Sequence, residues 1–354
     1  MCYNRKKGGG SVEWKVLPQR LLPWYEGHKR DLPWRQDREP YHVWLSEIML
    51  QQTRVEAVRG YYLRFLEALP DIAALAACDE ERLYKLWEGL GYYSRVRNLQ
   101  KAARVIMEQH GGEFPRDYAA IRALPGIGDY TAGAVSSICF DRPEPAVDGN
   151  VLRVITRVLA MDAPITKPQT KKDITERLRE IYPAGRCGDF TQALMELGAT
   201  VCLPNGAPNC DACPLSDLCR SREGELWKKI PVKEKKKERR TEEKTVFLLR
   251  CEGKLAVRKR DDRGLLAGLW EFPNTEGTSN AQQVLEQAAA WGCKPKELIK
   301  SVGRQHIFTH IEWKMTGYLI ECGACAEGFL WADEAALDRI YSLPTAFRQF
   351  LESI

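Results

Sequence analysis

Four cysteines lie close together in this 354-residue chain, near enough for their sulfurs to reach one inorganic centre. They are Cys202, Cys210, Cys213 and Cys219, with the spacing C-x7-C-x2-C-x5-C. The first gap, LPNGAPN, is too rich in Pro, Gly and Asn to form a regular helix or strand. Disulfides are one interpretation, but such clustering in an intracellular protein favours metal. Because thiolates bind zinc and iron–sulfur clusters alike, the spacing leaves the metal open.

A carboxyl group suited to acid catalysis is found in the helical segment SEIMLQQT, at Glu47. On a helix it neighbours Val43, Trp44, Leu50 and Gln51. Largely apolar surroundings favour the protonated form of a carboxyl group, which suits proton donation near neutral pH. The alternative is an ordinary surface glutamate.

A second carboxylate, Asp148, directly precedes the helical segment 151–160. There it could simply cap the helix, and Asn150 could do so equally well. The amides of a helix end also stabilise an anion, so Asp148 is expected to stay ionised and to stabilise a cationic sugar or attack it transiently. Glu47 and Asp148 together would form an acid and counter-ion pair.

The segment Leu124-Pro-Gly-Ile-Gly joins two helical segments. Gly126 and Gly128 permit backbone conformations with positive φ, and Ile127 can return to the core. The next helix then begins with exposed amides that can accept a phosphate. This pattern is typical of a helix-hairpin-helix, which grips the DNA backbone, although an ordinary helix–helix corner is the alternative.

The elements that position these residues are helical before residue 228 and mixed after it. Apolar residues at three- and four-residue spacing predict helices over 41–60, 80–90, 96–110, 117–124, 129–140, 151–160 and 169–181. Beyond residue 244, TVFLLRCEGKLAVRKR predicts a β-hairpin that turns at Cys251-Glu252-Gly253. Strands in IFTHIEWKMTGYLIEC and a helix in AQQVLEQAAAW complete an α/β domain. The predicted fold is an all-α body followed by a small α/β domain.

Composition argues against a membrane-spanning or secreted protein. The chain is 44% hydrophobic and 29% charged, with a net charge of +5, which is compatible with nucleic-acid binding. No run of 18 apolar residues exists, so no membrane span is expected. Twelve cysteines and no apolar leader predict a reducing location in the cytoplasm or nucleoid. The run at 228–244, with nine basic and four acidic residues, indicates a solvated linker or a contact to the DNA backbone.

Several stretches together resemble one family. LPGIGDYTAGA, AVDGN and the cysteine cluster are similar to the helix-hairpin-helix DNA glycosylases that include endonuclease III. SEIMLQQT, LWEGLGYYSRVRNLQKAA and the C-terminal domain narrow the resemblance to the adenine-specific mismatch glycosylases, the MutY family. The resemblance covers roughly residues 25–350. It implies flipping and removal of adenine opposite 8-oxoguanine or guanine in duplex DNA.

The resemblance assigns further site residues. It makes Glu47 the acid and Asp148 the counter-ion, with Asn150 and Tyr130 positioning them. Relatives that form a Schiff base carry Lys where Tyr130 stands, and no Lys occurs between Gly126 and Asp141. A phenol cannot form an imine, so a monofunctional glycosylase is expected.

Lesion contacts are also implied. Arg30, Trp34 and Arg35 resemble the family's adenine-pocket and damaged-base contacts. Gln52 and Tyr92 resemble residues wedged into the base stack, although Tyr92 and its neighbour Tyr93 could be core aromatics.

The C-terminal domain resembles the Nudix fold, most clearly in GLLAGLWEFP. Its helix lacks the paired acidic residues that bind magnesium in active Nudix enzymes, so a reader without hydrolysis is expected. Phe308, Thr309 and His310 match a loop, usually Phe-Ser-His, that inspects 8-oxoguanine. The C-x2-C pair formed by Cys322 and Cys325 is interpreted as a turn with incidental thiols.

Within this family the four clustered cysteines hold a [4Fe–4S] cluster, although the first gap is usually six residues and here is seven. The domain prediction, with a monomer expected, is a tail at 1–12, a helical catalytic region at 13–227, a linker at 228–244 and a Nudix-like domain at 245–354. Within the catalytic region, a six-helix barrel with the hairpin occupies about 30–145, and a cluster module combines the N-terminal helix with about 146–227. Two alternative functions remain besides adenine removal. They are a thymine glycosylase acting on G·T mismatches and a catalytically silent DNA-binding protein.

Overall fold

The computed structural model describes residues 14–234 and 238–353 and divides them into two compact units. The first unit takes in 14–66, 70–76 and 98–234, and the second takes in 67–69, 77–97 and 238–353. The predicted tail at 1–12 and part of the predicted linker, 235–237, lie outside the described residues.

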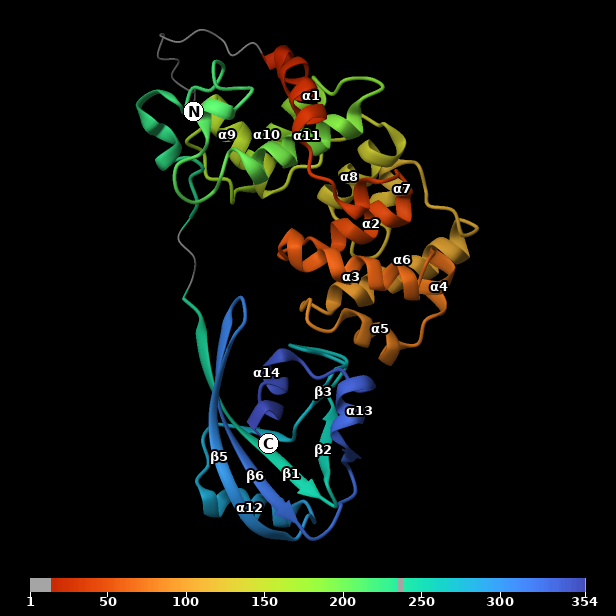
Figure 1. Ribbon diagram of the computed structural model, residues 1–354, viewed down its shortest axis with the longest axis vertical. Helices are drawn as coiled ribbons and strands as arrows, with labels where there is room; N and C mark the ends of the chain where they lie inside the picture. Colours follow the sequence, from red (N-terminus) through yellow and green to blue (C-terminus); the bar gives the residue numbers. More distant parts are fainter. Residues whose placement is uncertain (1–13, 235–237, 354) are drawn as a thin grey trace. The chain divides into compact units, whose positions relative to one another are not determined.

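Helices make up the first unit, together with the segments 67–69 and 77–97 that group with the second (Figure 1). The α-helices are α1 Leu17–His28, α2 Pro40–Met49, α3 Val55–Ala68, α4 Ile72–Ala77, α5 Glu80–Trp87, α6 Ser94–Gln109, α7 Tyr118–Ala123, α8 Asp129–Phe140, α9 Gly149–Leu159, α10 Pro168–Arg179 and α11 Cys187–Thr200. Short 3₁₀ helices are η1 Trp14–Val16, η2 Pro33–Arg35, η3 Cys210–Ala212 and η4 Glu223–Lys228. The predicted all-α body is confirmed, and six of the seven predicted helices fall within a few residues of their predicted ends.

The prediction of one helix over 41–60 is wrong. The structure breaks it after Met49 and starts α3 at Val55. Gln52 in the connecting turn has φ +59°, in the left-handed region that an α-helix cannot contain. Apolar spacing continues across the break, so the sequence pattern did not reveal the turn.

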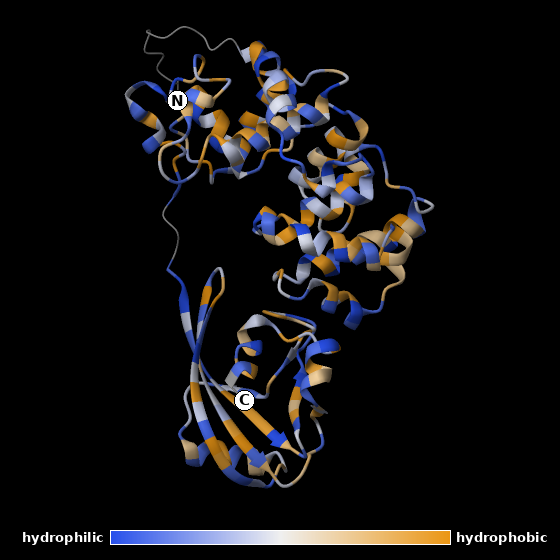
Figure 2. Ribbon diagram, in the orientation of Figure 1, coloured by the Kyte–Doolittle hydropathy of each residue, from blue (hydrophilic) through white to orange (hydrophobic). Residues whose placement is uncertain are grey.

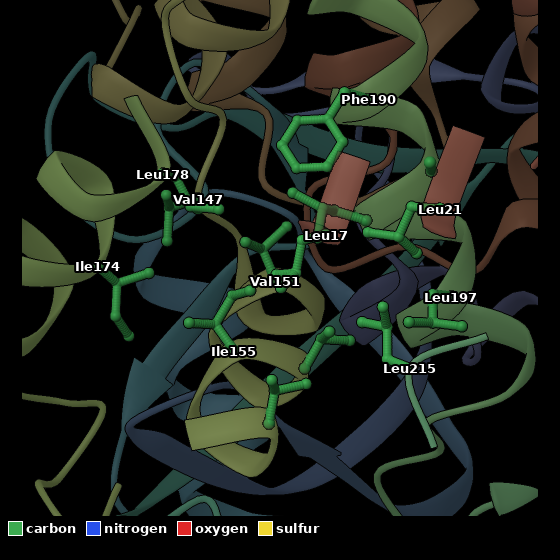
Figure 3. Packing of buried hydrophobic residues seen from close by; sticks show 14 of the residues in the cluster. Leu17, Leu21, Val147, Val151, Ile155, Ile174, Leu178, Phe190, Leu197 and Leu215 are labelled. Atoms are coloured by element: carbon green, nitrogen blue, oxygen red, sulfur yellow. The ribbon is translucent and has the colours of Figure 1, made fainter. Parts of the chain in front are cut away.

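One apolar core joins α1 to α9 and α11. Leu17 and Leu21 of α1 pack with Val151, Ile155 and Leu197 (Figure 3). Because α1 comes from the N-terminal end and α9 and α11 from the middle of the chain, this core holds distant segments as one body. It fixes the N-terminal end of α9, where Asp148 lies.

The second unit is built on a mixed sheet. Its strands are β1 Arg240–Cys251, β2 Lys254–Lys259, β3 Trp270–Glu271, β4 Asn274–Glu276, β5 Pro295–Ile307, β6 Ile311–Cys322 and β7 Leu330–Ala332. The helices are α12 Ala281–Ala290, α13 Glu334–Arg339, α14 Thr345–Arg348 and the 3₁₀ helix η5 Leu351–Ser353. Strand order is β3-β2-β1-β6-β5, with β4 on β1 and β7 on β2, and β1 runs parallel to β6.

The sheet buries both faces. Val246 and Leu248 of β1 join a core with Phe347, while Phe247 and Leu249 join a core with Val284 of α12. Figure 2 shows hydrophobic residues along β1 and β6 in the centre of the sheet. The predicted hairpin is confirmed, with Glu252 and Gly253 both at positive φ between β1 and β2. No helix among residues 14–234 and 238–353 is long and apolar enough to cross a membrane.

Candidate active site

A cavity of about 610 Å³ in the first unit collects all the predicted catalytic residues and the predicted adenine-pocket contacts. Those that line it come from η2 and the segment before it, α2 and the following turn, α8, and the start of α9: Arg30, Trp34, Arg35, Glu47, Gln52, Tyr130, Asp148 and Asn150. Segments from residue 30 to residue 150 thus converge on one space. It is large enough for a single base.

Glu47 is a buried acid. It lies on α2, which packs against α8, and it is 6% exposed. Burial raises the pKa of Glu47 to about 7, the hydroxyl of Tyr130 lowers it by donating a hydrogen bond to Glu47 Oε2, and the charge of Asp148 raises it. Burial also raises the pKa of Tyr130 well above 10, so the phenol remains a donor. Glu47 can therefore hold a proton near neutral pH.

Asp148 caps α9. Its carboxylate accepts from the amide of Val151 at 2.8 Å and from Asn150 Nδ2 at 2.8 Å. The predicted stabilisation of the anion by the helix end is opposed by burial, which raises the pKa of Asp148 above its ordinary 3.8 and outweighs these hydrogen bonds. The two carboxyl groups are thus both shifted upward, with Glu47 moved to about 7.

Asn150 connects Asp148 to the cysteine cluster through an arginine. Asn150 Oδ1 accepts from Arg153 Nη2 at 2.8 Å, and Arg153 Nε donates to the carbonyl of Cys202 at 2.7 Å. Arg153 Nη2 also donates to the carbonyl of Gly198 at 2.7 Å. A Cβ on Gly198 would lie 2.6 Å from Asn150 Cβ, so glycine is required for α11 to approach this closely.

Glu196 is a site residue that the sequence analysis missed. It lies on α11, its side chain is fully buried, and it accepts from Arg30 Nε at 2.6 Å and Arg35 Nη2 at 2.7 Å. Burial acts to raise its pKa, but hydrogen bonds and charge from the two arginines outweigh this, and the pKa of Glu196 is lowered. The sequence feature that could have identified Glu196 is its position as an acidic residue between the apolar residues of ALMELGA in α11.

Two more side chains of the cavity wall were not predicted. Lys171, on α10, is half-buried and is the one lysine among the described residues that line this cavity. Gln192, on α11, also lines it and accepts from the Tyr25 hydroxyl at 3.1 Å. Trp34 is buried and packs edge-on against Tyr62, with ring centroids 5.5 Å apart.

The predicted hairpin connects α7 and α8. Gly126 has φ +75°, and a Cβ there would lie 2.5 Å from Asn98 Cβ, so only glycine is accommodated. Ile127 is buried, and Gly128 is the N-cap of α8. The backbone thus turns with Ile127 inside and the first amides of α8 at the loop, as the sequence predicts.

The four clustered cysteines line one small cavity with Arg157 and Trp227: Cys202, Cys210, Cys213 and Cys219. Arg157 Nη1 donates to Cys202 Sγ at 3.3 Å. Among residues 14–234 and 238–353, no three Cys, His, Asp or Glu side chains form a group that could hold a single metal ion.

The remaining predicted lesion contacts lie in the second unit. Tyr92 is 47% exposed and has φ +49°, whereas Tyr93 is buried. The Tyr92 hydroxyl lies 2.7 Å from Thr309 Oγ1, so the structure brings these two predicted residues together. Phe308 packs edge-on against Trp313 with centroids 4.8 Å apart, and it anchors a turn in which Thr309 and His310 are exposed.

Comparison with known proteins places both units in recognised families. Residues 45–180 match the family model of the HhH-GPD superfamily base excision DNA repair proteins, and residues 245–353 match the NUDIX domain. The adenine DNA glycosylase of Mus musculus is 37% identical over 82% of this chain and 68% of its own length. That of Schizosaccharomyces pombe is 32% identical over 93% of this chain and 87% of its own length.

Two solved structures share the fold of the first, helical unit. A thermostable thymine-DNA glycosylase aligns with a TM-score of 0.55 at 31% identity, covering 59% of this chain and 96% of its own. Endonuclease III in a trapped complex with DNA aligns with a TM-score of 0.51 at 24% identity, covering 60% of this chain and 98% of its own. The second of these shows a shared fold alone.

Proposed function

This chain belongs to the adenine DNA glycosylase family of base excision repair enzymes, and we propose that it removes adenine mispaired with 8-oxoguanine or guanine in duplex DNA. A base in a duplex has to be flipped out of the stack before its glycosidic bond is accessible. The observation that carries the proposal is the cavity of about 610 Å³ lined by both Glu47 and Asp148.

Glu47 is the general acid of the proposed reaction. Adenine is a poor leaving group, and a proton delivered to the base as the bond breaks lowers the barrier. A pKa of about 7 keeps much of Glu47 protonated at neutral pH. Tyr130, which donates its hydroxyl to Glu47, holds the carboxyl group in place.

Asp148 stabilises the cationic sugar left behind. Its hydrogen bonds from Asn150 and the Val151 amide oppose protonation and fix its orientation. Water then adds to the sugar and completes hydrolysis. Methanolysis distinguishes an ion pair from a covalent adduct at Asp148, since an adduct leads to retained configuration at the anomeric carbon.

The residues that line the cavity also favour a monofunctional reaction, in which the base is removed without efficient strand cleavage. Tyr130 stands on α8 where a Schiff-base enzyme would carry lysine. Lys171 is an amine on the cavity wall, contributed by α10 instead. Borohydride should trap this protein on substrate DNA much more slowly than adenine is released, and any residual trapping should disappear in Lys171→Ala.

The base pocket is organised by an ion-paired trio. Arg30 and Arg35 are candidate contacts for adenine and its neighbours, and Glu196 holds both guanidinium groups. Such fixed donors recognise a base edge better than mobile surface arginines because less rotamer freedom is lost on binding. Trp34 and Gln52 complete the proposed lesion contacts of this cavity.

Duplex DNA is the proposed partner of the hairpin. The first amides of α8 follow Gly126, Ile127 and Gly128 and offer a phosphate site that reads no sequence. In the second unit, Tyr92, Phe308, Thr309 and His310 are the proposed reader of 8-oxoguanine.

A [4Fe–4S] cluster is the proposed cofactor, held by Cys202, Cys210, Cys213 and Cys219. The donor set fits, because four thiols line one cavity and a buried guanidinium donates to one sulfur. Each of the four cysteines would supply one thiolate ligand to the cluster. When bound, the cluster would cross-link residues 202–219, and Arg153 would connect that loop to Asn150.

One assay tests the function. The protein is incubated with duplexes that carry A·8-oxoG, A·G, T·G or U·G, and abasic sites are scored on each strand. Abasic sites should form at adenine in the first two duplexes only. Excision of thymine would favour the activity named for the thymine-DNA glycosylase to which the helical unit is similar. No excision from any duplex would overturn catalysis altogether.

A further inference from the structure

Four cysteines that the proposed cluster does not use gather at one end of the sheet in the second unit. Cys251 ends β1, Cys322 ends β6, Cys293 precedes β5, and Cys325 follows in the turn after β6. The parallel register pairs Arg250 with Glu321, so the ends of β1 and β6 are adjacent.

Two of these thiols are in contact. Cys325 Sγ lies 2.8 Å from Cys251 Sγ, closer than the roughly 3.5–4.0 Å of ordinary contact between heavy atoms. Cys322, by contrast, directs its thiol toward the carbonyl of Ile320 at 3.7 Å. The contact therefore selects Cys251 and Cys325 as a pair, across 74 positions of sequence, rather than the neighbours of the C-x2-C motif.

The pair combines an exposed thiol with a protected one. Cys325 is exposed in its turn, whereas Cys251 is 2% exposed. Burial, and then the hydrogen bond and charge of Cys325, raise the pKa of Cys251 to about 11. Cys325 is thus the thiol that solution reagents reach first, and Cys251 is positioned to react with whatever forms on it.

The turn that carries Cys325 is held to the segment before β5 by backbone hydrogen bonds. The amide of Gly323 donates to the carbonyl of Lys294 at 2.8 Å, and the amide of Ala324 donates to the carbonyl of Cys293 at 3.2 Å. These bonds fix the turn independently of the thiols. A disulfide can therefore form here with little backbone movement.

We propose that Cys251 and Cys325 form a reversible disulfide when the protein meets a low-molecular-weight disulfide, making this corner of the sheet a thiol-modification site. The C-x2-C spacing by itself indicates an incidental thiol at Cys325, and the contact with Cys251 changes that interpretation.

The electron balance is that of thiol–disulfide exchange. The Cys325 thiolate attacks one sulfur of glutathione disulfide, forms a Cys325–glutathione bond and releases one glutathione thiolate, which takes up a proton. Cys251 then loses its proton to solvent, attacks the Cys325 sulfur and releases the second glutathione. Two protein thiols are oxidised and one glutathione disulfide is reduced to two thiols.

Zinc binding by these cysteines is the alternative to a disulfide between Cys251 and Cys325. Two thiolates on one zinc ion would lie about 3.8 Å apart, which the closer Cys251–Cys325 contact does not match. Within 14–234 and 238–353, no group of side chains suited to a metal ion was found. Thiol pairing is therefore the favoured chemistry, and zinc becomes an outcome of the test.

The experiment uses the full chain with its cofactor, equilibrated in glutathione buffers of increasing disulfide content. Remaining thiols are alkylated, and the protein is digested without reduction and analysed by mass spectrometry. The expected result is a peptide that links Cys251 to Cys325, a loss of two alkylatable thiols, and full reversal by dithiothreitol. Cys325→Ser should abolish the link, and the matched variant Cys322→Ser should keep it.

Three outcomes would overturn the proposal. One is a Cys322–Cys325 link in place of the long-range one. Another is glutathione that stays on Cys325 at every ratio with no link to Cys251. The last is stoichiometric zinc in the protein as purified that is lost in both Cys251→Ser and Cys322→Ser. The visible absorbance of the cluster is followed in the same samples. If it stays constant, the proposed cluster ligands Cys202, Cys210, Cys213 and Cys219 are not the thiols being oxidised.

Discussion

The cavity of the first unit and the turn at residues 308–310 in the second have opposite physical characters. Glu47 and Glu196 are buried and are held by charged or hydroxyl donors, whereas Thr309 and His310 are exposed on a turn anchored by Phe308. Burial shifts pKa values and fixes orientation, which proton transfer requires. Exposure leaves the Thr309 and His310 side chains accessible to DNA. Chemistry should therefore be sensitive to single atoms in the cavity, and recognition should be only moderately sensitive at the turn.

Glu47→Gln should produce the largest effect. It removes the proton donor while keeping the shape of the side chain, so single-turnover adenine release should fall by about 10²–10⁴-fold. Circular dichroism and the melting temperature should stay close to those of the unchanged protein. Glu108→Gln, an exposed glutamate on α6, is the matched control and should retain full activity. Equal losses in both variants would remove Glu47 from the chemistry.

Asp148→Asn should produce the second-largest loss in the rate of adenine release. Asparagine caps a helix about as well as aspartate, so α9 should remain stable while the negative charge at the sugar is lost. Loss of one preorganised electrostatic group costs about 10²–10³ in rate. Rate of adenine release and urea unfolding should be measured on the same preparation. A variant that loses stability in proportion to activity would indicate a capping role alone.

Glu196→Gln should affect stability more than the carboxylate changes above. It leaves Arg30 and Arg35 without their buried counter-charge, which costs about 3 kcal/mol in the free energy of unfolding. Urea unfolding followed by the fluorescence of Trp34 and its neighbours measures this. The exposed pair Arg122–Asp129 offers the control, since Asp129→Asn should cost under about 1 kcal/mol. Similar costs at the two sites would contradict a structural role for Glu196.

Thr309→Ala combined with His310→Ala should have the smallest effect. Two lost hydrogen bonds of about 1 kcal/mol each predict roughly thirtyfold weaker preference for A·8-oxoG over A·G, with little change on A·G itself. The ratio of excision rates on the two duplexes is the measurement. An unchanged ratio would remove the turn from lesion reading.

The sequence predicted residues that belong to local motifs better than residues defined by long-range contacts. Asp148 as the cap of α9 and the loop at Gly126 follow from neighbouring residues, and the structure confirms their local geometry. The break at Gln52 was missed, because apolar periodicity continues through it. Glu196 was missed as well, because its partners Arg30 and Arg35 lie more than 160 positions away. The Cys251–Cys325 contact likewise depends on how β1 and β6 pair.

The pH dependence of single-turnover adenine release from A·8-oxoG tests the central claim most directly. The acid has to be protonated, so the rate should be high below pH 7 and should fall about tenfold per pH unit above about 7, where Glu47 ionises. Tyr130→Phe removes the hydrogen bond that lowers the pKa of Glu47, so its profile should shift to higher pH. A rate that stays flat from pH 6 to 9 in the unchanged protein would contradict Glu47 as the buried acid.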